Sequence, residues 1–175
     1  MEVAGEAYLF NLSLLAVTFA AVSVLVMLIR QTIGGKLSGF DIYLITSYVA
    51  HGFVIAICAV LPSLAAGFAP SPAVYWPLSS GAATILLGYN MAQTLLQRVR
   101  SADRKLPVFL ILAFSLHWLA VASLAANAVV PALRGPALFK GALTLSLAVI
   151  MWAFVRRIAS LATGRPIDDW DPKRS

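Results

Sequence analysis

Two histidines, His51 and His117, are the residues of this sequence whose side chains are best suited to chemistry. A neutral imidazole carries one hydrogen-bond donor and one acceptor, and it can also bind a metal ion or a haem iron. Each histidine lies near the middle of a long apolar run, where a polar side chain is costly unless it is paired or functional. The elements that carry the two side chains decide whether they can act together.

The composition is that of an integral membrane protein. Of the 175 residues, 61% are hydrophobic and 11% charged, and the mean hydropathy is +0.88. Such values lie far outside the usage of soluble domains. The basic residues behind the net charge of +6 stand at the ends of apolar runs, where topology explains them, so we expect no nucleic-acid partner. The single cysteine, Cys58, predicts neither a disulfide framework nor a cysteine metal cluster.

Five apolar runs are long enough to cross a bilayer, whose hydrocarbon core of roughly 30 Å needs about 20 apolar residues per helix. They predict one transmembrane domain over residues 1–163, followed by a short polar tail at 164–175. The predicted spans are 8–29, 41–68, 75–97, 107–130 and 137–157. The predicted fold class is therefore an all-α integral membrane protein, a bundle of five transmembrane helices.

The distribution of basic residues predicts the orientation of the bundle, because Lys and Arg in short loops accumulate on the cytoplasmic side. With the amino terminus outside and the carboxy terminus inside, only Arg134 and Lys140 of the 13 basic residues fall on the outer side. We expect this orientation in the lipid bilayer of a bacterial-type inner membrane.

Polar residues recur along single faces of three predicted spans, and we interpret these faces as one polar seam inside the bundle. At about 100° per residue, Tyr48 and His51 share a face of the second span, and His117 and Asn127 share a face of the fourth. The third span has the strongest polar stripe. The predicted seam comprises Asp41, Tyr48, His51, Tyr89, Asn90, Gln93, Gln97, His117 and Asn127.

The two histidines are also expected at the same depth in the membrane. Each lies ten residues beyond the inner end of its span, counted from Asp41 and Pro107, which is about 15 Å at 1.5 Å per residue. Asn90 of the third span, about 11 Å from the inner end, falls close to the same layer. This counting sets the depth of the side chains and leaves their orientation open.

Three functions are compatible with such a layer, and the one we favour is a pathway. In this hypothesis the protein is a channel or transporter-like protein for a small solute or ion, with Asp41 at the inner mouth of a polar cavity. The lack of an Asp or Glu at mid-membrane depth argues against a carboxylate-driven proton or sodium pump. Five spans are few for a complete pore, so we expect a homo-oligomer or a partner membrane subunit.

Two alternatives remain open. In the first, the chain is an electron-transfer subunit that binds b-type haem through His51 and His117, with Gly52 leaving room for the porphyrin. In the second, it is a non-catalytic structural or assembly subunit whose polar side chains hold helices together. The sequence contains no HExxH motif and no cysteine pair. It therefore predicts no catalytic site and no metal-ion cluster, and it favours a protein without enzymatic activity.

Overall fold

The described part of the chain is built from helices. The computed structural model describes residues 3–32, 39–69, 71–101 and 108–163, which contain five α-helices, one 3₁₀ turn and no strand. The α-helices are α1 (Glu6–Thr32), α2 (Gly39–Phe68), α3 (Pro72–Ser101), α4 (Val108–Val129) and α5 (Pro136–Thr163), and the 3₁₀ turn is Pro131–Leu133.

Four of these helices, α1, α2, α4 and α5, are long and apolar enough to cross a membrane. These four helices and the helical fold of the described residues confirm the prediction of an all-helical membrane protein. Helix α3 has the length, with 30 residues, but its polar side chains make it less apolar than the other four. The fifth span and the orientation of the termini remain predictions.

Prolines shape the start of α3 in a way that the sequence interpretation did not anticipate. Pro72 begins the helix three residues before the predicted start at residue 75, because its fixed φ and missing N–H suit the first helical position. Pro77 lies inside α3 and Pro62 inside α2, and neither ends its helix. The connection between α2 and α3 is therefore confined to residues 69–71.

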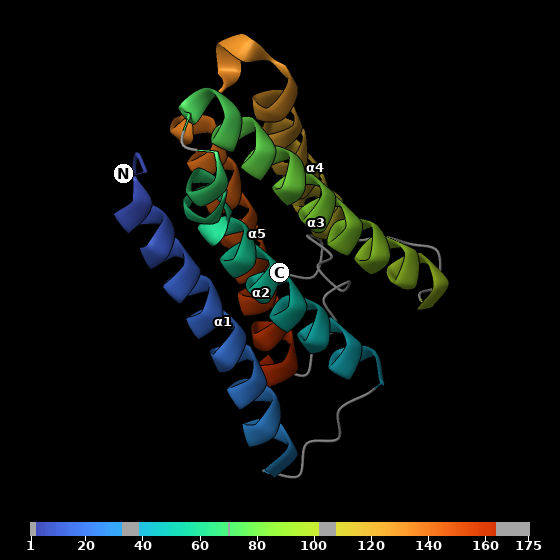
Figure 1. The fold of residues 1–175 in the computed structure, drawn as a ribbon. Coiled ribbons are helices and arrows are strands. Elements are labelled where there is room, and N and C mark those ends of the chain that lie inside the picture. The colour runs from blue at the N-terminus through green and yellow to red at the C-terminus, as the bar shows by residue number, and fades with distance from the viewer. Residues whose placement is uncertain (1–2, 33–38, 70, 102–107, 164–175) are drawn as a thin grey trace.

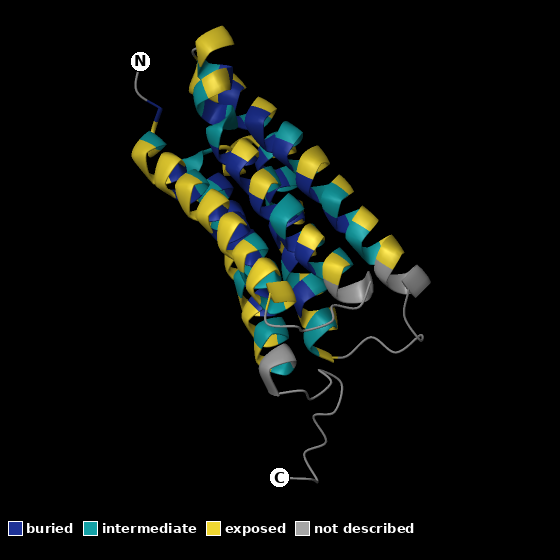
Figure 2. Cartoon of the chain, turned by 90° about the horizontal axis from the view of Figure 1, so that it is seen from below, coloured by how far each residue is buried: buried dark blue, intermediate teal, exposed yellow. Residues whose placement is uncertain are grey.

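Helices α2, α3, α4 and α5 form a ring in chain order, each packed against the next, and α5 closes the ring against α2. Helix α1 lies outside the ring against α2 and, over a smaller area, against α5 (Figure 1). Successive helices run in opposite directions. Exposed residues cover the outward faces of the helices, and buried residues gather between them (Figure 2).

Small residues bring α1 and α2 close together. A Cβ atom on Gly52 would lie 3.0 Å from the carbonyl oxygen of Ala16 and 3.2 Å from Cβ of Ala20. The Ser13 hydroxyl donates to the carbonyl of Ala56 across the same contact, at 3.3 Å. In a bilayer, where lipid tails are as apolar as leucine, this close packing of small residues is a main source of helix association.

We call the end of the bundle where α2 ends and α3 begins the outer end, following the predicted orientation, and the opposite end the inner end. Buried aromatic rings fill the outer end, with Tyr75 and Trp76 centroids 5.2 Å apart and Trp76 and Phe139 centroids 5.6 Å apart. A hydrogen bond between the Tyr8 and Thr144 hydroxyls joins α1 to α5 there. The outer end is therefore closely packed.

Candidate functional site

One side chain from each helix of the ring joins a polar cluster inside the bundle. His51 comes from α2, Asn90 from α3, His117 from α4 and Ser146 from α5. Nδ1 of His51 donates to Oδ1 of Asn90 at 2.9 Å, and the Ser146 hydroxyl donates to Nε2 of His51 at 2.9 Å. The His117 ring contacts the His51 ring edge to face, with centroids 4.7 Å apart. We call these four residues the histidine cluster.

The hydrogen bonds set the tautomer of both imidazoles. Because the amide oxygen of Asn90 can only accept, His51 carries its proton on Nδ1 and accepts from Ser146 at Nε2. Nδ1 of His117 lies 3.0 Å from the carbonyl oxygen of Ala113, which also can only accept, so His117 is protonated on Nδ1 as well. Both side chains are buried, at 2% and 5% exposure.

One ring nitrogen of the histidine cluster, Nε2 of His117, has no hydrogen-bond partner among the described residues. The atom is buried and carries a lone pair in this tautomer. A buried acceptor that nothing satisfies costs about 1–3 kcal/mol. Water, a donor group of a ligand or a metal ion can satisfy it. This nitrogen is therefore a candidate ligand-binding atom.

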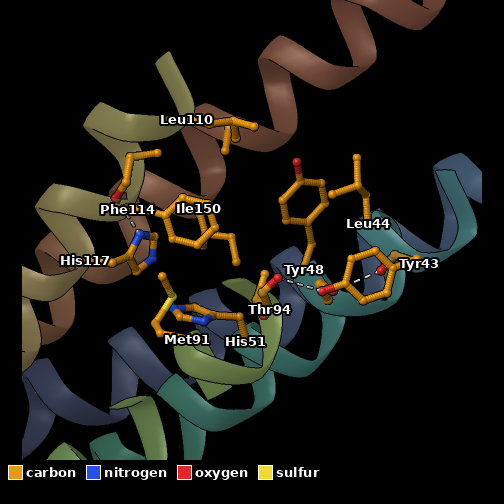
Figure 3. A pocket seen from close by; sticks show the side chains of 13 residues that line it. Tyr43, Leu44, Tyr48, His51, Met91, Thr94, Leu110, Phe114, His117 and Ile150 are labelled. Carbon is orange, nitrogen blue, oxygen red and sulfur yellow. Dashed lines mark hydrogen bonds between the residues drawn. The ribbon is translucent and has the colours of Figure 1, made fainter. Parts of the chain in front are cut away.

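A cavity of about 70 Å³ leads to the two histidines from the inner half of the ring. Figure 3 shows side chains from α2, α3, α4 and α5 around it, most of them apolar. Its lining includes Tyr43, Ser47, Tyr48, Met91, Thr94 and His117. Since roughly 10–15 Å³ of such volume holds one water molecule, the cavity has room for a few waters or one small solute.

The cavity ends at the histidine cluster. Toward the outer end, the next turns of the four ring helices contribute fully buried side chains, namely Ile55, Leu87, Leu124 and Leu143, each 0% exposed. Close packing of such side chains leaves no passage for water. The residues that line the cavity thus lie in the inner half of the bundle, and buried apolar side chains occupy the next turns of the ring helices toward the outer end.

The structure brings four of the predicted seam residues to this pocket and its cluster. His51, Asn90 and His117 belong to the histidine cluster, and Tyr48 lines the cavity with 9% exposure. Asp41, the predicted inner mouth, has a side chain that lies outside the described residues.

The polar stripe predicted along α3 does not face the cavity. Tyr89 is 67% exposed, and Gln93 and Gln97 are exposed as well. The face of α3 turned to its neighbours instead carries Leu87 and Met91, which are 0% and 4% exposed. Only Asn90, next to this face, reaches His51. The polar stripe therefore lies beside the buried stripe and not on it. Polar residues on a membrane helix indicate a face that contacts protein or water, but they do not indicate which neighbour that face contacts.

Asn127 forms a separate contact at the outer end. Its Nδ2 donates to the Ser80 hydroxyl at 3.0 Å and to the carbonyl of Gly135 at 3.1 Å. Its Oδ1 accepts from the N–H of Gly135 at 2.8 Å. Asn127 is therefore fully used in joining α4 to α3 and to the loop before α5, about 15 Å from His117 at 1.5 Å per residue.

Two residues of the site, Ser146 and Met91, were not predicted. Several described serines in these helices donate to the carbonyl four residues earlier, as Ser23 and Ser79 do, so a lone serine in an apolar run gives no signal. Met91 reads as an ordinary core residue for the same reason. Their places follow from which face each helix turns inward, which single-helix patterns do not determine.

The cluster does not fit a haem held by His51 and His117. The iron and the porphyrin plane would have to lie between the two imidazoles, but the rings are in direct edge-to-face contact at 4.7 Å. Both ring nitrogens of His51 already have hydrogen-bond partners. Gly52, the residue expected to make room for the porphyrin, packs against α1 instead.

Comparison of the chain with protein-family models, with curated proteins and with solved structures finds no match. The helices are those of a polytopic membrane protein. A more specific function has to come from the cavity and the histidine cluster.

Proposed function

We propose that the protein is a channel or transporter-like membrane protein that binds a small solute or ion at His117 and His51. The observation that carries this proposal is the buried Nε2 lone pair of His117, which has no partner among the described residues and belongs to a residue that lines the cavity. A site that combines an unsatisfied acceptor with room for a ligand is suited to binding.

A purely structural role accounts for the histidine cluster less well. Asn127 shows what a structural polar residue does in this fold, because its amide nitrogen and oxygen are both paired within the protein. Nδ1 of His117 donates to the carbonyl of Ala113 on its own helix, and the backbone of Ser146 on α5 also interacts with the ring, but Nε2 has no hydrogen-bond partner of good geometry among the described residues. A residue that only joined helices would be expected to bond across to another helix with both nitrogens.

Access from one side supports a transport cycle rather than an open pore. The cavity lining extends to Tyr43 and Leu44 near the start of α2 and to Leu110 near the start of α4. In the orientation that the basic residues predict, this is the cytoplasmic half of the bundle. Passage of a solute then requires the outer half to open in a second conformation.

We also propose that a second copy of this chain covers the exposed face of α3. Tyr89, Gln93 and Gln97 recur there every fourth residue on the helix that is least apolar of the five. Polar groups that face lipid are unfavourable. A two-fold axis beside α3 would let the amides of two Gln93 side chains donate to and accept from each other, because an amide carries both kinds of group.

Thiol reactivity tests the proposed access and the second conformation. In a Cys58→Ala background, Ser47→Cys places a thiol in the cavity wall, and Ser79→Cys places the matched control in the packed outer half at a site with 1% exposure. A small membrane-impermeant thiosulfonate added from the inner side should modify residue 47 at least about tenfold faster than residue 79. Equal rates would refute the cavity as an access route.

The native thiol reports on the opening of the outer half. Cys58 lies seven residues beyond His51 on α2, toward the outer end, and is fully buried. If the protein alternates between two conformations, a reagent added from the outer side should modify Cys58 slowly but completely. If Cys58 stays unmodified while Ser47→Cys reacts, the cavity is a static pocket and the transport proposal fails.

A further inference from the structure

We propose that the cavity binds a soft monovalent metal ion, Cu(I) in a cell, through Nε2 of His117, the thioether of Met91 and Nε2 of His51. The proposal rests on the proposed function, because it names the ligand class of the same cavity.

Three residues with nitrogen or sulfur donor atoms, His51, Met91 and His117, line the cavity near its closed end. The lone pair of His117 Nε2 is buried and unpartnered. Met91 is 4% exposed and lines the same cavity as His51 and His117, and Figure 3 shows its side chain directed toward the region of the two rings. The donors come from α4, α3 and α2, so an ion bound by all three would join three helices.

The charge of the site selects a monovalent ion. No Asp, Glu or deprotonated thiol lines the cavity among the described residues, which also hold no group of three or more His, Cys, Asp and Glu. Nothing in the site therefore neutralises an ion. Since the cost of transferring an ion into an apolar medium rises with the square of its charge, a divalent ion would cost about four times as much as a monovalent one.

The donor atoms select a soft ion. Alkali and alkaline-earth ions require several oxygen ligands, whereas imidazole and thioether groups are ligands of Cu(I). Zn²⁺ prefers four ligands, commonly including charged ones, and the cavity does not offer them. Cu(I), and Ag(I) as its chemical analogue, is stable with two or three neutral nitrogen and sulfur ligands.

Ser146 controls the availability of the third donor. Its hydroxyl now donates to Nε2 of His51. It can turn instead to the carbonyl four residues earlier on α5, as the hydroxyl of Thr144 does on the same helix at 2.7 Å. The lone pair of His51 is then free to bind the ion, while Nδ1 keeps its bond to Asn90. Binding the ion therefore needs only rotation of the Ser146 hydroxyl. The hydroxyl exchanges one acceptor for another, and the ion takes its place at Nε2 of His51.

The test is a titration of the full-length Cys58→Ala protein in detergent, since removal of the only thiol removes its own affinity for soft metals. Under anaerobic, reducing conditions, Cu(I) is partitioned between the protein and bicinchoninate, and Ag(I) binding is followed by calorimetry. We expect one ion per chain. The near-isosteric Met91→Leu variant should bind at least about tenfold more weakly, and His117→Gln should lose saturable binding.

Met151→Leu is the matched control, because Met151 is a half-buried methionine of α5 that does not line the cavity. Its affinity should equal that of the parent. X-ray absorption of the Cu(I) protein should show one sulfur scatterer, which disappears in Met91→Leu and persists in Met151→Leu. Since a leucine replaces methionine with little change in volume, both variants should unfold at the parent's temperature.

The metal titration and the thiol experiments test the metal site and the proposed transport function separately. If the metal does not bind, or binds equally well in Met91→Leu and His117→Gln, the metal inference is overturned, even when Ser47→Cys and Cys58 react as expected. If neither thiol reacts, the proposed function fails independently of the metal titration.

Discussion

The imidazoles of His51 and His117 meet edge to face, with ring centroids 4.7 Å apart, across the diagonal of the four-helix ring. Their helices, α2 and α4, are not neighbours in that ring, whose sides are formed by α2 with α3, α3 with α4, α4 with α5, and α5 with α2. The ring contact therefore places polar atoms where all four helices converge. A substitution in any one residue of the histidine cluster should alter the hydrogen bonds of the other three.

Removal of the Ser146 hydroxyl tests the bond that links α5 to the cluster. Ser146→Ala leaves Nε2 of His51 without its donor. We expect a loss of about 0.6–1.7 kcal/mol in the free energy of unfolding, as found for hydrogen bonds between membrane helices. Unfolding in mixed micelles measures it. The control Ser123→Ala removes a hydroxyl that bonds within its own helix and should change little.

The contact between α1 and α2 depends on the missing side chain of Gly52. In Gly52→Ala the new methyl group would lie 3.0 Å from a backbone oxygen, which cannot move aside easily. We expect a destabilisation of about 1–3 kcal/mol, as for other overpacked sites. Gly81→Ala, where no heavy atom lies within 4 Å of the added Cβ, should be neutral or stabilising. Equal effects of the two changes on thermal unfolding would argue against this packing.

Asn127 should be required for the outer end and not for ligand binding. Asn127→Leu removes three hydrogen bonds and leaves the buried Ser80 hydroxyl and the Gly135 N–H without their partner. A loss of about 1–3 kcal/mol in stability follows. The control is Asn11→Leu, on the exposed face of α1. Ag(I) affinity of the folded Asn127→Leu protein should stay within about twofold of the parent.

The exposed polar face of α3 should determine the oligomeric state. Gln93→Leu removes the amide pairing proposed for the two-fold contact and is expected to weaken self-association about tenfold, which corresponds to about 1.4 kcal/mol. Energy transfer between labelled chains in liposomes, diluted with lipid, measures it. Thr18→Val, on the exposed face of α1, should have no effect. Unchanged association of Gln93→Leu would assign the contact to another surface.

The orientation of the bundle is a prediction from the basic residues alone. A reporter fused to the carboxy terminus should be active only on the cytoplasmic side, and one fused to the amino terminus only on the outer side. A carboxy-terminal reporter that is active outside would reverse the direction of the cavity. The thiol experiment on Ser47→Cys would then show reaction from the outer side.

Depth was predictable from the sequence because it depends only on counting. His51 and His117 lie at matching distances from the inner ends of their spans, and the structure brings their rings into contact. The helical periodicity of α2 also made Tyr48 and His51 share a face, and both line the cavity. These predictions rest on the geometry of one helix at a time.

Rotation of a helix about its own axis was not predictable in the same way. On α3, the polar residues Tyr89, Gln93 and Gln97 and the buried residues Leu87 and Met91 form neighbouring stripes, and only packing against α2 and α4 decides which stripe faces inward. Met91 and Ser146 thus enter the site through tertiary contacts. The residue pattern of a single helix does not encode these tertiary contacts.

The fastening of the outer end has a mechanical consequence. The bond between Asn127 and Ser80 ties two hairpins, α2 with α3 and α4 with α5, together at the outer end, so it would have to break before the outer half could open. Near the inner end each hairpin is tied within itself, by Tyr43 to the carbonyl of Thr94 in one and by Phe109 against Trp152 in the other. From Asn127 to the start of α4 is about 28 Å, so a tilt of about 5° displaces the inner end by about 2.5 Å. That displacement is close to the diameter of a water molecule, so a very small angular change is enough to widen or close the entrance.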